Sequence, residues 1–280
     1  MTGAGSAAHE RISAAIRGAA PGPALVAFMT AGYPRREQFR AQLALVASAA
    51  DVVEIGVPFT DPMADGPAVQ AAGLRALKAG ATMKTTLALV RDFRATDEAT
   101  PIVLMGYCNP VAAYGIAAFA RDAAAAGVDG VILVDLPPEE ADEFAPALNA
   151  AGIDVIRLST PTTTDARLPA VLRGAGGFLY YVSITGVTGT KEFDLDEVER
   201  EVKRIKAQTA LPVGVGFGIR TAERAAAIAR FADAAVVGSA IVARIADFMP
   251  PDGKKVKPGC ARDVLGFVAG IGAGVRAARR

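Results

Sequence analysis

The chain has 280 residues, of which 52% are hydrophobic and 21% are charged, and its formal net charge at pH 7 is +1. A chain of this size can bury a large core, either as one α/β barrel or as two smaller domains. Because the charges nearly balance, bulk electrostatics favour neither nucleic acid nor an anionic membrane as a partner.

The cysteines and the N-terminus indicate where the protein works. Cys108 and Cys260 lie far apart and lack CxxC spacing, so we expect neither a disulfide framework nor a zinc site. The N-terminal stretch MTGAGSAAHERISAAIRG has no apolar run typical of a signal peptide. No segment approaches the ~18 uninterrupted apolar residues of a membrane span. These features predict a soluble, cytoplasmic protein.

Short apolar runs rich in β-branched residues predict eight strands, at 24–30, 51–56, 101–107, 129–135, 154–159, 178–184, 212–217 and 233–239. The runs are nearly continuous rather than alternating, which is typical of parallel strands covered on both faces.

Amphipathic stretches between the runs predict helices, at 36–50, 67–79, 84–95, 115–127, 138–152, 194–209 and 221–232, with added terminal helices at 6–18 and 258–278. This alternation implies parallel strands joined by right-handed crossovers. Eight such units predict a TIM (β/α)8 barrel that forms a single domain over residues 1–280. An open doubly wound sheet is the less favoured alternative, because no GxGxxG follows the first strand.

The stretch EIGVPFTDPMADGP, residues 54–67, follows the second strand and holds three carboxylates and no basic residue. Glu54 is flanked by apolar residues, and partial desolvation would raise its pKa and suit it to donate and accept a proton. Asp65 lies on a loop stiffened by proline, where it could stay ionised and accept a hydrogen bond from a substrate N–H. The alternatives are a structural ion pair for Glu54 and a turn or cap role for Asp65. Asp61, before Pro62, is more simply a turn residue.

Glycine clusters follow the last three strands, as GVTG at 186–189, GFGI at 216–219 and GSAIV at 238–242. In TIM barrels the loops after strands seven and eight, with a short helix N-terminus, commonly hold a phosphate. Glycines let backbone N–H groups approach the anion, and Ser239 adds a hydroxyl donor. Tight turns are the alternative reading of these glycines.

Aromatic residues on three strands offer an apolar wall. Phe28, Tyr107 and Tyr180 lie on the first, third and sixth strands, although ordinary core packing explains each one alone. His9, the single histidine, falls in the predicted N-terminal helix, which makes a histidine-based triad unexpected. We therefore expect carboxylate chemistry without a metal. A carboxylate pair also fits glycoside hydrolysis, but the glycine clusters favour a phosphorylated substrate.

These motifs together resemble those of the tryptophan synthase alpha chain family. The stretch EIGVPFTDPMADGPAVQ (54–70) is similar to the family signature, and FMTAGYP (28–34), MGYCNP (105–110), YYVSITGVTGT (180–190) and VVGSAIV (236–242) extend the likeness. The resemblance implies retro-aldol cleavage of indole-3-glycerol phosphate to indole and glyceraldehyde 3-phosphate. It implies that Glu54 is the general acid/base and that Asp65 binds the indole N–H and stabilises positive charge on the ring.

The resemblance also implies substrate-binding residues and a partner. The implied residues are Phe28, Tyr107 and Tyr180 around the indole, Gly189, Gly218, Gly238 and Ser239 around the phosphate, and Thr188 in a mobile loop. The family resemblance implies no cofactor in this chain. It implies a beta chain that carries pyridoxal phosphate, receives the indole and completes an αββα heterotetramer.

Two other functions stay open. The first is another phosphate-binding barrel enzyme, such as an indole-glycerol-phosphate synthase or an isomerase. Such enzymes commonly use lysine, cysteine or aspartate at strand ends, and the predicted strands carry no such lysine. The second is a barrel that serves only as a binding partner of the beta chain. The presence of both Glu54 and Asp65 argues against it.

Overall fold

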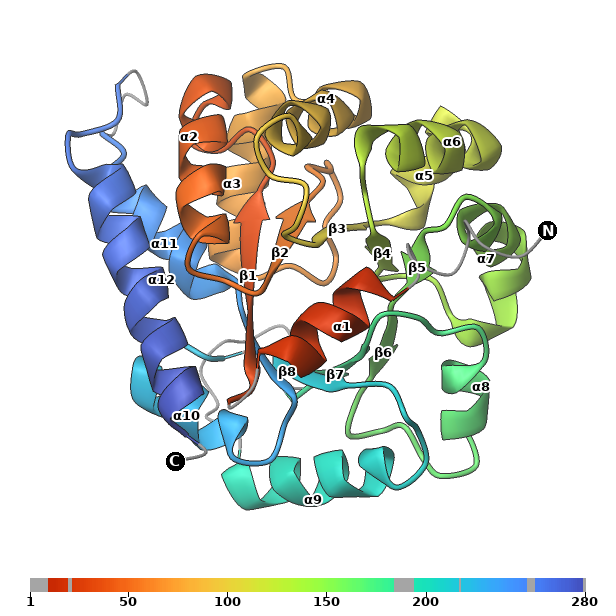
Figure 1. Ribbon diagram of the computed structural model, residues 1–280. Helices are drawn as coiled ribbons and strands as arrows, with labels where there is room; N and C mark the ends of the chain where they lie inside the picture. The colour runs from red at the N-terminus through yellow and green to blue at the C-terminus, as the bar shows by residue number, and fades with distance from the viewer. Residues whose placement is uncertain (1–9, 20–21, 184–193, 217, 251–254, 279–280) are drawn as a thin grey trace.

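The computed structural model describes residues 10–19, 22–183, 194–216, 218–250 and 255–278. A ring of parallel strands stands at the centre, and helices surround it (Figure 1). The strands are β1 (Ala24–Thr30), β2 (Val52–Gly56), β3 (Ile102–Gly106), β4 (Gly130–Leu133), β5 (Asp154–Val155), β6 (Arg157–Ser159), β7 (Leu179–Val182), β8 (Val213–Gly216) and β9 (Ala234–Val237).

The helices that follow these strands account for most of the outer layer. They are α2 (Arg36–Ala47), α3 (Pro67–Lys78), α4 (Met83–Arg94), α5 (Cys108–Tyr114), α6 (Ile116–Ala126), α7 (Ala141–Ala150), α8 (Leu168–Leu172), α9 (Leu195–Lys206), α10 (Ala222–Ala229) and α11 (Ser239–Ala246). The 3-10 turn η1 (Pro138–Glu140) precedes α7, α1 (Arg11–Gly18) precedes the first strand, and α12 (Cys260–Ala277) follows the last.

The barrel closes through one interrupted strand. The hydrogen-bonded order runs from β5 through β4, β3, β2, β1, β9, β8 and β7 to β6. Ile156 alone separates β5 from β6, and its N–H donates to the carbonyl of Val131 at 2.9 Å. The two ends of the sheet are therefore one stretch, residues 154–159, which pairs with β4 on one side and β7 on the other. The predicted TIM barrel is confirmed.

The predicted strands all appear, most of them one or two residues shorter than expected at their ends. Three short helices, α5, α8 and α11, lie outside the predicted helical ranges, and α11 begins at Ser239 in the glycine cluster 238–242. Segment 108–114 contains Pro110 and has no clear apolar period, and α8 has only five residues. Segments this short carry too little periodicity to predict a helix.

Alternate strand residues form two cores. Inward-facing Val26, Val52, Ile132 and Val236 pack together inside the barrel, while their chain neighbours pack under the outer helices. Helix α1 lies across the N-terminal end of the barrel in Figure 1, and its buried Ile12 joins the inner cluster. One end of the barrel is thus plugged, which leaves chemistry to the end where the strands terminate.

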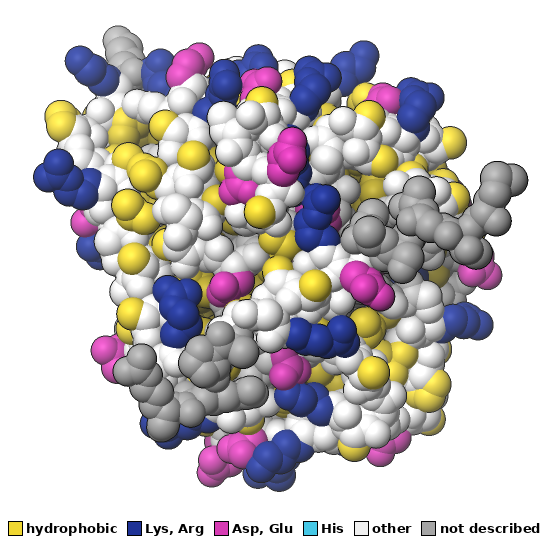
Figure 2. All heavy atoms as spheres, viewed as in Figure 1, with side chains coloured by type: hydrophobic (Ala, Val, Ile, Leu, Met, Phe, Trp, Pro, Cys, Tyr) yellow, Lys and Arg dark blue, Asp and Glu magenta, His cyan; other side chains and the backbone are white. Residues whose placement is uncertain are grey.

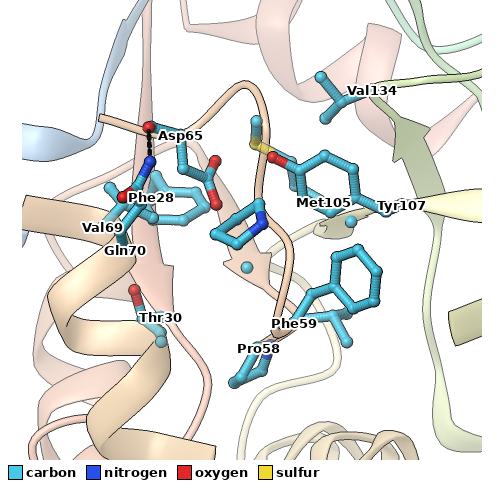
Figure 3. A pocket seen from close by; sticks show the side chains of 15 residues that line it. Phe28, Thr30, Pro58, Phe59, Asp65, Val69, Gln70, Met105, Tyr107 and Val134 are labelled. Atoms are coloured by element: carbon cyan, nitrogen blue, oxygen red, sulfur yellow. Dashed lines mark hydrogen bonds between the residues drawn. The ribbon is translucent and has the colours of Figure 1, made fainter. Parts of the chain in front are cut away.

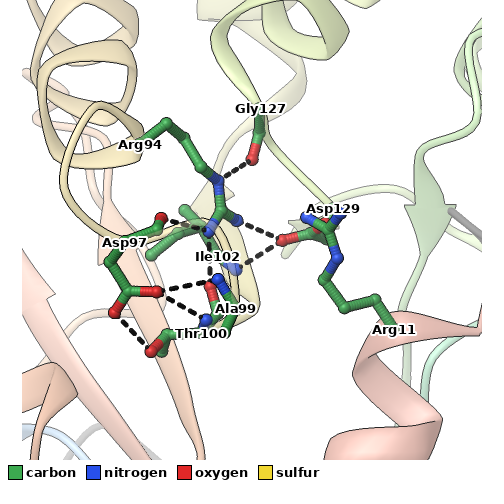
Figure 4. A network of polar contacts seen from close by, with 8 residues as sticks. All are labelled: Arg11, Arg94, Asp97, Ala99, Thr100, Ile102, Gly127 and Asp129. Carbon is green, nitrogen blue, oxygen red and sulfur yellow. Dashed lines mark hydrogen bonds and ion pairs between the residues drawn. The ribbon is translucent and has the colours of Figure 1, made fainter.

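Polar contacts fix the plug. Asp129, just before β4, accepts hydrogen bonds from Arg11 of α1 at 2.7 Å and from the N–H of Ile102 at 2.7 Å, and it also pairs with Arg94 of α4 (Figure 4).

On the face seen in Figure 2, basic and acidic side chains are interspersed. Within the described ranges, no helix has the length and apolar character needed to cross a membrane.

Candidate active site

Glu54 projects into the barrel from β2, where its register partner on β1 is Phe28. It is 1% exposed, and its Oε1 has no hydrogen-bond partner among the described residues. Burial raises the pKa of Glu54 from 4.5 to about 8. At neutral pH the carboxyl is therefore largely protonated, so it can give a proton to a bound molecule.

Tyr180 of β7 is close enough to Glu54 to be affected by its charge. Burial, and then the Glu54 carboxylate, raises the pKa of Tyr180 well above its usual value. Gly216 on the neighbouring strand makes room for the ring, because a Cβ at this position would lie 2.0 Å from the Tyr180 hydroxyl. A phenol and a carboxyl thus lie near each other in a buried part of the barrel.

Asp65 lies on the acidic loop, residues 57–66, above the ends of β2 and β3. The Tyr107 hydroxyl accepts a hydrogen bond from the N–H of Ala64 at 3.1 Å and donates one to the Asp65 carboxylate. Gln70 of α3 donates to the Asp65 carbonyl at 2.8 Å. Burial raises the pKa of Asp65 from 3.8 to about 6, and the Tyr107 hydroxyl opposes that rise. Asp65 therefore remains mostly ionised at neutral pH.

A cavity opens between the strand ends and the acidic loop (Figure 3). Its walls include Phe28, Thr30, Asp65, Met105 and Tyr107. Phe59 adds a further apolar surface, since its ring centroid lies 5.3 Å from that of Tyr107. Glu54 does not line the cavity, but its neighbour across the ladder, Phe28, does. The Asp65 carboxylate thus lies on the cavity wall, and Glu54 lies on β2, next to Phe28 of β1.

The predicted phosphate end lies on the other side of Phe28. Gly238 follows β9 and precedes α11, which begins at Ser239, and a Cβ on Gly238 would lie 3.2 Å from the Cβ of Phe28. Gly218 follows the adjacent strand β8 with φ of 75°, a conformation that favours glycine. Thr188 and Gly189 lie outside the described residues. A helix N-terminus next to two glycines is suited to an anion.

Residues not predicted from the sequence also contribute. Thr30, Phe59 and Gln70 line the cavity, and Gln70 also binds the loop. The sequence could have indicated Thr30, since it lies two residues after Phe28 on one strand and therefore on the same face.

Asp61 is exposed, and its carbonyl accepts the N–H of Met63, as expected of a turn residue. In the described part of the chain, no three His, Cys, Asp or Glu side chains are grouped to hold a metal ion.

A closed TIM barrel with a protonated glutamate, an ionised aspartate and an apolar cavity beside glycine-rich strand ends and a helix N-terminus defines a class of protein. It is an enzyme that performs acid–base chemistry on a small, partly apolar, phosphorylated substrate. The model of the tryptophan synthase alpha chain family matches residues 17–261, and the chain belongs to this family.

Individual relatives agree with this assignment. The tryptophan synthase alpha chain of Acidiphilium cryptum (strain JF-5) is 54% identical over 91% of this chain and 93% of its own length. The alpha subunit from Legionella pneumophila str. Paris superposes with a TM-score of 0.85 at 37% identity, covering 95% of this chain and 98% of that one. Tryptophan synthase from M. tuberculosis, in an open form with BRD0059 bound, superposes with a TM-score of 0.83 at 33% identity, covering 95% and 98%. The chain is thus a lyase of tryptophan biosynthesis that cleaves indole-3-glycerol phosphate to indole and glyceraldehyde 3-phosphate.

Proposed function

We propose that Glu54 and Asp65 carry out this cleavage in the present chain. The observation that supports the proposal most directly is the separation of their pKa values, to about 8 for Glu54 and about 6 for Asp65. Because of this separation, one carboxyl can give a proton at the pH at which the other is an anion. Two carboxyls in different environments can then play two roles.

The reaction begins with proton transfer to the indole ring. The protonated Glu54 carboxyl donates its proton to C3 of the indole, which leaves a positive charge on the ring nitrogen. The Asp65 carboxylate accepts the indole N–H as a hydrogen bond and stabilises that charge. Both groups act in surroundings where burial strengthens the electrostatic interaction.

Breaking the carbon–carbon bond restores the starting state of the enzyme. The electrons of the bond between C3 and the glycerol carbon return to the ring, which regenerates neutral indole. The hydroxyl on that glycerol carbon becomes the aldehyde carbonyl of glyceraldehyde 3-phosphate and loses its proton. The Glu54 carboxylate formed in the first step takes this proton, so no proton is gained or lost overall.

The remaining predicted residues would hold the substrate. We propose that Phe28 and Tyr107 contact the indole and that Tyr180 borders the reacting carbon beside Glu54. The phosphate would bind to backbone N–H groups at Gly218 and Gly238 and to the Ser239 hydroxyl. Thr188 and Gly189, outside the described residues, would complete the phosphate end.

The proposal extends to a partner subunit. Family membership implies partnership with a beta chain. We propose that the two form an αββα heterotetramer, that the beta chain carries pyridoxal phosphate and receives the indole, and that this chain requires no cofactor. We also propose that residues 1–280 act as one domain and that the enzyme works in the cytoplasm.

Release of indole from indole-3-glycerol phosphate tests the catalytic roles. We expect slow release by the purified chain and faster release with the beta chain. Glu54→Gln should lower kcat at least about a hundredfold, because it removes the general acid and base, while circular dichroism shows an unchanged fold. Glu37→Gln, at an exposed position in the first turn of α2, is the matched control. Unchanged turnover in Glu54→Gln would exclude Glu54 from the mechanism.

A further inference from the structure

Thr30 is a buried polar residue to which the mechanism above gives no role. It is the last residue of β1, it is 3% exposed, and its Oγ1 has no hydrogen-bond partner in the part of the chain that the structure describes. Buried hydroxyl groups in proteins are nearly always hydrogen-bonded, and an exception calls for a physical explanation. The cavity offers that explanation, because Thr30 forms part of its wall together with Phe28 and Asp65 (Figure 3).

The side chain points into the barrel rather than toward the outer helices. On β1, Ala24 and Val26 belong to the inner core, and successive strand residues alternate between the two faces. By the same alternation Phe28 and Thr30 continue the inward series toward the mouth, and both line the cavity. A valine would fill the same volume, so packing alone does not require a hydroxyl here.

The strand order places Thr30 between the two ends of the proposed site. Glu54 is on β2, Gly238 follows β9, and β1 lies between these strands with hydrogen bonds to both. Thr30 is in register with Gly56, two residues beyond Glu54 toward the mouth. A substrate that touches Glu54 with one end and Gly238 with the other must pass the end of β1 with its middle part.

In indole-3-glycerol phosphate that middle part is the glycerol chain, which carries the hydroxyl groups of the molecule. We infer that Thr30 is a specificity-determining residue whose Oγ1 hydrogen-bonds a hydroxyl of the substrate's three-carbon linker. This inference rests on the proposed placement of the substrate between Glu54 and Gly238. The contact favours hydroxylated linkers over plain alkyl linkers, because a ligand without the hydroxyl leaves the buried Thr30 oxygen unpaired.

Two ligands that differ only in the linker distinguish this contact from a structural effect. Indole-3-glycerol phosphate is the substrate, and indole-3-propanol phosphate has the same ring, phosphate and chain length without linker hydroxyls. We expect Thr30→Val to lower kcat/KM for the substrate about tenfold, the effect of one lost hydrogen bond. The inhibition constant of the propanol analogue should stay within about twofold of the wild-type value, because that ligand never made the bond.

Further variants keep the test decisive. Thr30→Ser retains the hydroxyl and should behave like the wild type with both ligands, whereas Thr30→Ala should repeat the selective loss even if Thr30→Val does not fold. Thr86→Val is the control, since Thr86 is fully buried in α4 and its hydroxyl donates to the Thr82 carbonyl. Equal losses with both ligands, or no loss with either, would overturn the inference. A wild-type chain that releases no indole would instead overturn the proposed function.

Discussion

At the scale of single residues, environment gives two similar carboxyl groups different chemistry. Glu54 is buried beside apolar neighbours, with burial as the cause of its raised pKa. Asp65 is less completely buried, and the Tyr107 hydroxyl stabilises its charged form. Glu54 is therefore an acid and Asp65 an anion, although both belong to one short stretch of the chain. This combination suits a reaction in which a proton is delivered and a cation is stabilised.

The pH dependence of catalysis follows from these two groups. We expect kcat/KM to rise as Asp65 ionises, with a pKa of about 6, and to fall as Glu54 ionises, with a pKa of about 8. The profile of the free enzyme should therefore be bell-shaped. Initial rates of indole release at low substrate concentration measure it. A rate that continues to rise above the upper value would mean that Glu54 acts first as a base.

Glu54 should also make stability depend on pH. Its pKa is higher in the folded state, about 8, than its ordinary value of 4.5, so between these values the folded protein binds more protons than the unfolded chain. The free energy of unfolding contributed by this group is therefore lost as pH rises through that window. The glutamine in Glu54→Gln does not titrate. The stability of this variant relative to the wild type should therefore increase by about 1.4 kcal/mol for each pH unit between the two pKa values. Urea unfolding at about pH 5 and about pH 8 provides the comparison, and a pH-independent difference would contradict it.

At the scale of elements, the acidic loop is held from two sides. Tyr107, at the end of β3, binds the loop at Ala64 and at the Asp65 carboxylate, while Gln70 of α3 binds the Asp65 carbonyl. The loop therefore depends on contacts with Tyr107 after β3 and with Gln70 of α3, not on its prolines alone. These contacts determine where the Asp65 carboxylate points.

Removing the Tyr107 hydroxyl tests this arrangement. In Tyr107→Phe the hydrogen bond that lowers the pKa of Asp65 is lost, so we expect the acidic limb of the pH profile to move above about 6. Activity at neutral pH should fall severalfold and recover partly at higher pH. Tyr114→Phe is the matched control, because the Tyr114 hydroxyl donates to Asp122 at 2.8 Å in a remote helix pair. An acidic limb that stays in place would show that Tyr107 does not tune Asp65.

At the scale of the whole molecule, stability and chemistry occupy opposite ends of the barrel. The N-terminal end is plugged by α1 and tied by Asp129 to α1, α4 and β3 (Figure 4). The other end bears the cavity, the carboxylates and the start of α11. This separation is typical of TIM barrels, and it allows the mouth to keep unpaired buried polar groups.

Substitution of Asp129 tests whether stability at the plugged end of the barrel is separate from catalysis at the mouth. We expect Asp129→Ala to lower the free energy of unfolding by about 3–5 kcal/mol, because it leaves the mostly buried Arg94 without its carboxylate. The kcat/KM of the folded fraction should stay close to that of the wild type. Asp92→Ala removes a more exposed pair, 3.6 Å from Arg40, and should cost less than about 1 kcal/mol. A large change in kcat/KM would show that the plug and the mouth are coupled.

The amino-acid pattern alone predicted much of this molecule. The apolar runs predicted the eight strands and hence the barrel, because covered parallel strands have a local signature that does not depend on their neighbours. The unusual loop 54–67 indicated Glu54 and Asp65, and the glycine clusters indicated the side of the mouth that would hold a phosphate. The likeness to the family then suggested the reaction.

Other features were decided only by the tertiary structure. The barrel closes through a strand interrupted at Ile156, α1 plugs one end, and Tyr107 binds Asp65, and none of these contacts has a signature within a short stretch of sequence. The pKa values of the two carboxyls also depend on burial by residues far away in the chain. The physical reason is that periodicity is a local property, whereas desolvation and hydrogen bonding across strands depend on which distant residues come together.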